Sequence, residues 1–356
     1  MACAGLGNAR WAPFDRAEMP TDHPEFVHPS VPGEAERLIG EAMASVKAAG
    51  GRVVVGPWLG EVGFEVLYWI PFLHWLLESH GVRADQVTVV SRGGVEPWYD
   101  GLCGRYVEIF DSLTPDEFRR ATLELWQATG GLQKQVVVRQ WDERVLDGAL
   151  GDGWRDQALL HPQLLYRLFR NVWQGALPLR DFLDRAVHRP WSRPDYDGLI
   201  PSLPEEFTAA RFYFRDSFPD TPENRAIVRD TIERLASRRP VVLLNTGVVV
   251  DEHLDAEPDD DPRVLRPLAG TAPERNLLAQ SAVVAGARLF VGTYGGLAHL
   301  APFYGVPTIG FASDSAEINP VHLALARRTA AAYETSLAVV DRAGFELIDA
   351  TAVRAA

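Results

Sequence analysis

Short runs of aliphatic and β-branched residues recur along the chain and alternate with longer stretches whose apolar residues follow helical spacing. The runs predict strands over 52–55, 86–90, 106–110, 135–138, 208–214, 241–244, 288–291 and 308–311. The helical spacing predicts helices over 33–49, 59–80, 161–173, 221–237, 276–285 and 296–304, and a further helix that begins at Thr114. Pro71 is expected to kink or divide the helix over 59–80. Strands that alternate with helices are typical of parallel sheets with helices on both faces, so the predicted fold class is α/β.

The pattern also predicts how the chain is divided. Prolines gather between positions 178 and 204 and separate two series of strands and helices. We therefore expect an N-terminal arm and helix over 1–50, a Rossmann-like domain with its linker over 51–204, and a second Rossmann-like domain over 205–356. Ligands of doubly wound parallel sheets bind at the carboxyl ends of the strands. The two domains are therefore expected to face each other across a cleft that holds the ligand.

Composition and charge narrow the classes of function. The 35 Lys and Arg residues against 48 Asp and Glu residues give a formal net charge of -13, which argues against a nucleic acid or an anionic membrane as partner. The 2 cysteines are too few for a disulfide framework or a cysteine-rich zinc site. No stretch approaches the roughly 18 to 20 apolar residues of a membrane span, and no apolar signal segment begins the chain, so we expect a cytoplasmic protein.

The junction of the first predicted strand and its helix combines glycines with carboxylates. Gly60 and Gly63 flank Glu61, and Glu65 lies one helical turn further along. Glycines permit a tight turn and a close approach to a ligand, and a carboxylate at this point would project into the cleft as a general base. The alternative is that Glu61 is an acid in a first helical turn, stabilised there by the helix dipole. The stretch is not a dinucleotide fingerprint, because G-x-G-x-x-G is absent.

A second glycine-rich turn follows the penultimate predicted strand. Thr293, Tyr294, Gly295 and Gly296 lead directly into a helix, and His299 follows one turn later. Free backbone N–H groups and the dipole at a helix start favour phosphate, and glycines let its oxygens approach. This pattern predicts a phosphate site. The alternative is a packing turn of the kind found in any α/β protein, with His299 as a histidine that binds no ligand.

Together, these two stretches resemble the heptosyltransferase-type glycosyltransferases of the GT-B fold. In that family the first strand leads to a Leu-Gly-Asp-Val-like loop and a proline-containing helix, and here Leu59-Gly60-Glu61-Val62 stands in the matching place. The family's second domain has Val-Gly-x-Asp-Ser-Gly-x-x-His-x-Ala and then Gly-x-Pro-Thr. Here positions 291–301 are VGTYGGLAHLA and positions 305–308 are GVPT. The sequence departs from the family where glutamate replaces the first aspartate and where Tyr-Gly replaces Asp-Ser.

The resemblance implies an inverting, metal-independent glycosyltransferase that uses no cofactor besides a nucleotide-diphosphate sugar as co-substrate. Glu61 would be the general base, and the second domain would hold the donor. The donor phosphates would lie at the turn 293–296 beside His299, and near Arg215, which follows the first strand of that domain. The acceptor would be a glycan, a lipid-linked molecule or a small molecule.

The acceptor side of the expected site has its own candidates. Arg92 and Arg139 follow the second and fourth predicted strands and therefore point to the same sheet edge. Gly60, Gly63 and Glu65 lie at that edge too, so these five residues are the acceptor-side candidates.

Two further functions stay open. A nucleotide-sugar 2-epimerase can use the same fold on a single substrate, and it would form product without an acceptor. A non-catalytic nucleotide- or sugar-binding protein is the other alternative, because Tyr294-Gly295 replaces Asp-Ser. The acidic run 251–261 fits no EF-hand spacing, and we expect it to be a solvated loop and not a metal site.

Overall fold

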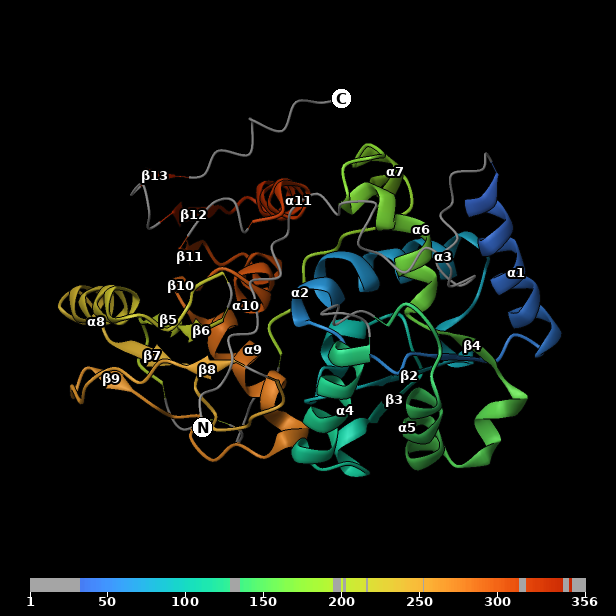
Figure 1. Cartoon of the computed structure of the whole chain (residues 1–356), viewed down its shortest axis with the longest axis horizontal. Coiled ribbons are helices and arrows are strands. Elements are labelled where there is room, and N and C mark those ends of the chain that lie inside the picture. Colours follow the sequence, from blue (N-terminus) through green and yellow to red (C-terminus); the bar gives the residue numbers. More distant parts are fainter. Residues whose placement is uncertain are drawn as a thin grey trace.

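Two mainly parallel sheets form the frame of the protein and lie side by side (Figure 1). The computed structural model describes residues 33–128, 135–194, 200, 203–215, 217–251, 253–313, 318–341 and 346–347, so the arm expected before residue 33 lies outside the described residues. The predicted fold class, α/β with two Rossmann-like domains, is confirmed.

The first sheet is small and parallel throughout. It consists of β1 (Val53–Val55), β2 (Val87–Ser91), β3 (Arg105–Glu108) and β4 (Ala158–Leu160). The strand order is β3-β2-β1-β4. All three residues of β1 are buried, because this strand lies inside the sheet with both faces covered, and its sequence is accordingly an uninterrupted run of valines.

The second sheet is larger and has the order β13-β12-β11-β10-β5-β7-β9. Its strands are β5 (Thr208–Arg211), β7 (Val241–Leu243), β9 (Val264–Leu265), β10 (Leu289–Thr293), β11 (Thr308–Ala312), β12 (Leu337–Asp341) and β13 (Glu346–Leu347). Neighbours are parallel except for β13, which pairs antiparallel at one edge. Counted from β5, this is the 3-2-1-4-5-6 order of a Rossmann domain with one added edge strand. A separate ribbon pairs β6 (Tyr213–Phe214) with β8 (Leu254–Asp255).

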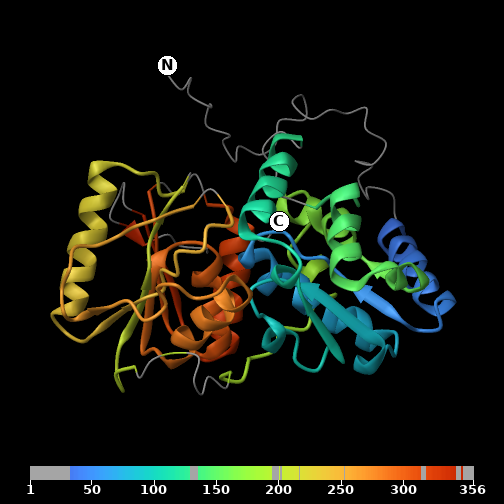
Figure 2. The ribbon, with the colours of Figure 1, turned by 90° about the horizontal axis from the view of Figure 1, so that it is seen from below.

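The helices pack on these sheets. They are α1 (Glu34–Ala48), α2 (Val62–Phe64), α3 (Ile70–Ser79), α4 (Pro115–Ala128), α5 (Gln140–Leu150), α6 (Gln163–Trp173), α7 (Arg180–Leu183), α8 (Pro222–Ala236), α9 (Asn276–Gly286), α10 (Gly296–Leu300) and α11 (Pro320–Ala332). Figure 2 shows α8, in yellow, on one face of the second sheet and the orange helices α9 and α10 on the face turned toward the first domain. Within the described ranges, no helix is long and apolar enough to cross a membrane.

Helix α4 shows how local sequence specifies an element. The Thr114 N–H donates to the Glu117 carboxylate at 2.9 Å, and the Glu117 N–H donates to the Thr114 hydroxyl at 3.3 Å. This reciprocal pair satisfies two N–H groups that have no partner within the helix. The helix start predicted at Thr114 is confirmed.

The segment 135–138 does not form the predicted strand. The place beside β1 is taken by β4 instead, which the sequence analysis did not predict. Gln135 is buried, and its side-chain amide donates to the Pro57 carbonyl at 2.8 Å and accepts from the Leu59 N–H at 2.9 Å. The segment therefore anchors the loop after β1 and is not part of the sheet.

The strand predicted over 208–214 is also different, because it breaks at Phe212 into β5 and β6. The Thr293 hydroxyl donates to the carbonyl of Tyr213 at 2.8 Å and accepts from its N–H at 3.0 Å. The Thr293 side chain thus takes the place of a neighbouring strand as the hydrogen-bond partner of the Tyr213 backbone. From there the chain leaves the large sheet and continues as β6, which pairs with β8.

The helix predicted over 59–80 forms in three parts. Between α2 and α3 the backbone takes a π-helical turn over Glu65–Trp69. Such turns are rare and frequently occur at functional sites. Pro71 is the second residue of α3 and follows directly on the π-helical turn. The division expected at Pro71 is therefore found just before it.

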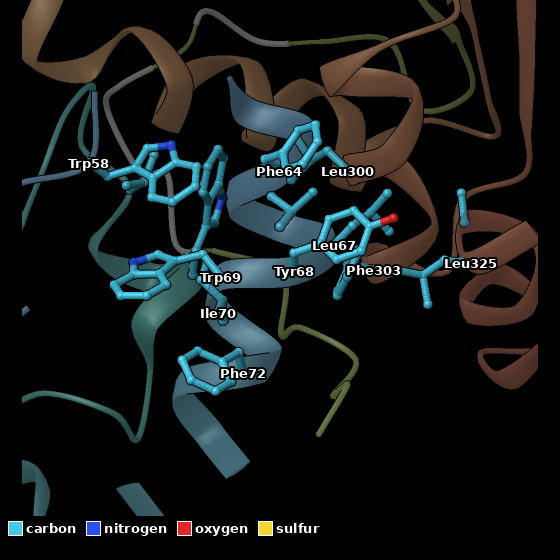
Figure 3. Close-up of a cluster of buried hydrophobic side chains, with 14 of the residues drawn as sticks. Trp58, Phe64, Leu67, Tyr68, Trp69, Ile70, Phe72, Leu300, Phe303 and Leu325 are labelled. Carbon is cyan, nitrogen blue, oxygen red and sulfur yellow. The ribbon is translucent and has the colours of Figure 1, made fainter. Parts of the chain in front are cut away.

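One hydrophobic core extends through both domains. It includes Trp58, Phe64 and Trp69 from the first domain and Phe303 and Leu325 from the second, all buried. Figure 3 shows the second-domain members beside the helical segment that begins at α2. Relative motion is the usual expectation for domains unless their interface is large and hydrophobic. Here the interface is continuous with the core, so the two domains pack as one body.

Candidate functional site

Each sheet has a point where the strand order reverses, and ligands of such sheets bind outside the carboxyl ends of the strands at that point. In the first sheet the point lies between β1 and β4, and in the second it lies between β5 and β10. The loop after β1 leads to α2, and the turn after β10 leads to α10. These two short helices are in direct contact, so the loops meet where the domains join (Figure 1).

Glu61 lies at this junction, as the residue that precedes α2. It is half-buried and has an extended backbone conformation. Burial lowers the pKa of His299 and raises the pKa values of Tyr166 and Tyr213. The negative charge of Glu61 acts on all three groups and favours a higher pKa in each. Glu61 therefore lies near enough to side chains of both domains for its charge to act on them.

His299 faces the first domain from α10. Its ring lies against Gly63, where a Cβ would come within 2.7 Å of Nδ1. Neither ring nitrogen has a hydrogen-bond partner among the described residues. Burial lowers the pKa of His299 to about 4, although the charge of Glu61 opposes this, so the ring is neutral at pH 7. A neutral imidazole has one donor and one acceptor nitrogen, and here both are buried without a hydrogen-bond partner among the described residues.

Tyr294 and Tyr166 add two more buried groups beside His299 and Glu61. The Tyr294 ring packs edge-on against His299 with the ring centres 5.0 Å apart. Within the described part of the chain, neither tyrosine hydroxyl has a hydrogen-bond partner. Buried polar atoms without partners are uncommon, and they often mark the place of a water or a ligand.

The glycines of the turn after β10 are in close contact with other parts of the protein. A Cβ at Gly295 would overlap the Tyr213 hydroxyl, and a Cβ at Gly296 would lie 2.9 Å from the Cβ of Val62. Thr293 donates its only hydroxyl hydrogen to the backbone of Tyr213. Packing therefore requires small residues in this turn, and the phosphate site predicted there stays a prediction.

Two of the acceptor-side candidates contact each other. Glu65 is fully buried and accepts hydrogen bonds from Ser91 at 2.7 Å, Tyr99 at 2.7 Å and Arg92 at 3.0 Å. Burial raises the pKa of Glu65, although the positive charge of Arg92 opposes the rise. Arg92 also donates to the Gly60 carbonyl. This pair therefore fixes the loop that precedes Glu61.

The remaining acceptor-side candidates have structural surroundings too. A Cβ at Gly60 would lie 3.3 Å from the Trp58 ring and 3.5 Å from the Tyr166 hydroxyl. Arg139 is the residue that precedes α5, and its N–H donates to Asp142 at 2.7 Å. Gly60 thus lies at the junction, whereas Arg139 begins a helix of the first domain.

The carboxyl ends of β5 and β7 bring the predicted candidate Arg215 together with side chains that were not among the candidates. Asp251 pairs with His253 at 2.8 Å, and His253 Nε2 lies 3.1 Å from a guanidinium nitrogen of Arg215. Asp255 pairs with Arg211 at 3.1 Å. The expectation that the run 251–261 is a solvated loop is therefore wrong for its first part.

The two-residue spacing of Asp251 and His253 is the signal that could have revealed this pair. The backbone N–H of His253 also donates to the Asp251 carboxylate at 3.0 Å. Such a bond from an aspartate side chain to the backbone two residues later is common in turns. Among the described residues, no group of three or more His, Cys, Asp or Glu side chains could hold a metal ion.

Comparison with known proteins gave matches among solved structures. No family model matches the chain, and no curated protein matches it. The Escherichia coli heptosyltransferase WaaC with ADP has 15% identity and a TM-score of 0.43, covering 85% of this chain and 98% of that one. A putative UDP-N-acetylglucosamine 2-epimerase from Listeria monocytogenes has 12% identity and a TM-score of 0.31, covering 76% and 81%. The UDP-GlcNAc 2-epimerase from Methanocaldococcus jannaschii has 9% identity and a TM-score of 0.28, covering 82% and 88%.

Proposed function

We propose that the protein is a glycosyltransferase that moves a sugar from a nucleotide-diphosphate sugar to an acceptor hydroxyl, with inversion and with Glu61 as general base. The observation that supports this most directly is the position of Glu61. The carboxylate follows the switch-point strand of one Rossmann-like domain and lies beside His299, which follows the switch-point strand of the other. A base from one domain and a donor site on the other can then act on one pair of substrates.

In this proposal the reaction is a single displacement. The acceptor oxygen attacks the anomeric carbon while its proton passes to the Glu61 carboxylate, and the bond from that carbon to the diphosphate breaks. The nucleoside diphosphate leaves with the electron pair of that bond. No metal and no resident cofactor takes part, and donors of the second domain stabilise the charge that develops on the leaving group.

The side chains of the second domain have separate roles in the proposal. Arg215 contacts the diphosphate, since a guanidinium is always charged and can donate two parallel hydrogen bonds to phosphate oxygens. His299 and Tyr294 contact the substrates with their buried, unpartnered polar atoms. The turn 293–296 lies next to the phosphates, and its glycines let the domains close around them.

The first experiment identifies the donor and asks for turnover. A thermal-shift screen of nucleoside diphosphates and their sugars should reveal a ligand, because a ligand at 100 times its Kd stabilises the folded protein by about 2.7 kcal/mol. The matching sugar nucleotide is then incubated with a panel of acceptors. Product that forms without any acceptor would instead identify a 2-epimerase, and binding without turnover would identify a sugar-nucleotide-binding protein.

The second experiment tests the base. A positioned general base contributes about 10²- to 10⁴-fold to the rate, so Glu61→Gln should lower kcat by about that factor. The Kd of the nucleoside diphosphate should stay nearly unchanged, because the donor belongs to the other domain. Glu61→Asp keeps a carboxylate but shortens it by one methylene, and it should retain part of the activity. Transfer at the wild-type rate by Glu61→Gln would exclude Glu61 as the base.

A further inference from the structure

We propose that Tyr213 is a further residue of the donor site, whose hydroxyl donates a hydrogen bond to the diphosphate of the nucleotide sugar, and that Asp251 and His253 position it. This inference rests on the proposed function. It concerns a group of side chains that comes together at the carboxyl ends of β5 and β7, and it involves no proton transfer.

The backbone and ring of Tyr213 are held from several sides. The Thr293 hydroxyl bonds both the N–H and the carbonyl of Tyr213. The ring of His253 packs on the tyrosine ring with the centres 4.2 Å apart and the planes inclined by 35°. The guanidinium of Arg211 lies 5.9 Å from the centre of the tyrosine ring. These contacts direct the hydroxyl to the Cα of Gly295, where a Cβ would overlap it.

The orientation of the His253 ring follows from its two partners. An arginine can only donate, so His253 Nε2, which lies 3.1 Å from the Arg215 guanidinium, accepts. His253 Nδ1 faces the Asp251 carboxylate at 2.8 Å. Burial would raise the pKa of Asp251, but the paired His253 holds it well below its usual range, so the carboxylate stays ionised. The ring that supports Tyr213 is thus held in one orientation by a partner at each ring nitrogen.

The chemistry presented beside Gly295 suits a polyphosphate. Burial raises the pKa of Tyr213 to about 12, and the charges of Asp251 and Glu61 add to the rise against Arg211 and Arg215. The phenol is therefore protonated at neutral pH and can donate. Arg215, two residues further along the chain than Tyr213, adds a permanent positive charge. A hydroxyl donor and a guanidinium side by side match the oxygens of a diphosphate.

Calorimetric titration of the full chain with ADP, UDP and GDP tests this inference. Tyr213→Phe removes only the hydroxyl and keeps the ring on His253. For the nucleotide that the wild-type protein binds, we expect the Kd to rise by at least about 10-fold, as for a lost hydrogen bond to a charged group. The affinity for the corresponding nucleoside, which has no phosphates, should not change. Tyr304→Phe removes a tyrosine hydroxyl elsewhere in the second domain, one that is buried without a partner among the described residues, and it is the control.

The positioning role of His253 has its own readout. His253→Gln keeps an acceptor for Arg215, whereas His253→Leu keeps only bulk. The glutamine variant should therefore bind the diphosphate more tightly than the leucine variant, and the two should bind the nucleoside equally. Equal diphosphate affinities of the two variants would show that His253 acts as bulk alone.

A second pair of variants tests the geometry without any nucleotide. Gly295→Ala should lower Tm, because the new methyl group overlaps the Tyr213 hydroxyl. Combining it with Tyr213→Phe removes that oxygen and leaves the nearest ring carbon at 3.2 Å from the methyl position, so part of the lost Tm should return. If the double variant is no more stable than Gly295→Ala, the hydroxyl does not lie on this turn and the inference fails.

The titrations separate the two proposals. If the wild-type protein binds a nucleoside diphosphate and Tyr213→Phe binds it equally well, the inference about Tyr213 fails while the proposed function stands. Tighter binding by Tyr213→Phe would also overturn it, because the hydroxyl would then obstruct the phosphates. If the wild-type protein binds none of the three nucleotides, both the proposed function and this inference fail.

Discussion

At the scale of single residues, His299 couples stability to pH. The pKa of its imidazole is 6.5 in the unfolded chain and about 4 in the fold, because burial disfavours the charged form. Between these two pH values the unfolded state binds more protons than the folded state. The stability that His299 contributes is therefore complete above pH 6.5 and is lost as the pH falls toward 4. At 1.36 kcal/mol per pKa unit, the full loss is roughly 3–4 kcal/mol.

We therefore expect His299→Gln to reduce the loss of unfolding free energy between pH 7 and pH 4, measured by urea denaturation. His188 is the matched control, since burial also lowers its pKa to about 4 while it bonds the Leu67 carbonyl. His188→Gln should reduce the acid loss to a similar extent. Only His299→Gln should also weaken nucleoside-diphosphate binding, and an unchanged affinity would make His299 a packing residue.

Glu65 and Arg92 form an ion pair that is almost fully buried. Arg92→Leu leaves a buried carboxylate uncompensated, so we expect it to cost about 3–5 kcal/mol of unfolding free energy. The pKa of Glu65 is already raised by burial. A raised acid pKa gives stability that is complete below the unfolded value of about 4.5 and is lost as pH rises through the folded value, so Arg92→Leu should be least harmful in acid. Denaturation at pH 4.5 and pH 7 measures this.

The double variant Glu65→Leu with Arg92→Leu removes both charges. It should cost less than the sum of the two single variants, because neither charge is left alone. Additive losses would show that the two side chains do not interact in solution.

For single residues, the sequence predicts the element on which a residue lies better than it predicts the side chains that the residue contacts. Glu61 was placed at a strand-to-helix turn by the glycines around it, and it lies there. The contact of Glu65 with Arg92 joins residues 27 positions apart, and no local pattern encodes it. The same limit applies to Tyr213, whose position over Gly295 depends on how two strands and a turn pack.

At the scale of elements, the contact between α2 and α10 depends on glycine. A side chain at Gly296 would meet Val62 at 2.9 Å, so Gly296→Ala should lower the unfolding free energy by about 1–3 kcal/mol, as overpacking does. Gly40 is the control, because it lies exposed within α1 with nothing within 4 Å of its Cβ position. Gly40→Ala should raise stability by roughly 0.5–1 kcal/mol, since alanine is the better helix former.

Thermal and urea denaturation of the two variants would measure both effects. The same contact means that a larger residue at Gly296 disturbs the domain junction as well as any phosphate beside it. A neutral Gly296→Ala would show that the two helices are further apart in solution than in the structure.

Elements were predicted from the sequence where local pattern determines them. The buried valine run of β1 and the threonine cap of α4 are examples, because a run or a cap acts within a few residues. The segment 135–138 has the same aliphatic character as a strand, but Gln135 bonds the loop after β1 and the edge place goes to β4. An apolar run shows that a segment is partly buried. Whether that segment forms a strand depends on the residues that surround it in the folded protein.

At the scale of the whole molecule, the shared core should make the two domains unfold together. All 10 tryptophans lie between Trp11 and Trp191, before the second domain begins, so tryptophan fluorescence reports on the first domain and on the interface, where Trp98 donates to Ser281 and Trp191 packs on Phe303. Far-ultraviolet circular dichroism reports on both domains. Leu325 is fully buried in the shared core but belongs to α11 of the second domain. Leu325→Ala should cost about 2–5 kcal/mol, and it should shift the fluorescence midpoint as far as the dichroism midpoint.

Ile232 provides the comparison, because it belongs to a separate core cluster of the second domain. Ile232→Ala should also shift both midpoints together if the chain unfolds as one unit. If either substitution left the unfolding midpoint measured by fluorescence unchanged, the two domains would unfold independently.

The two-domain plan was predicted from the alternation of strands and helices, and the strand orders confirm it. The closeness of the domains was not predicted. Phe64 and Phe303, which lie in the interface, have the same apolar character as residues inside a domain. Composition alone cannot show whether a buried residue packs within a domain or between two.

The π-helical turn over Glu65–Trp69 has a consequence for insertions and deletions. Each residue of an α-helix turns the chain by about 100° and advances it by about 1.5 Å. Deleting one residue there would restore the ordinary helical repeat and swing α2, with Glu61, away from the second domain while α3 kept its own packing. The number of residues in this segment is then a stricter requirement than their identity. In comparisons between relatives, a one-residue gap at this place would be a stronger sign of changed chemistry than many substitutions elsewhere.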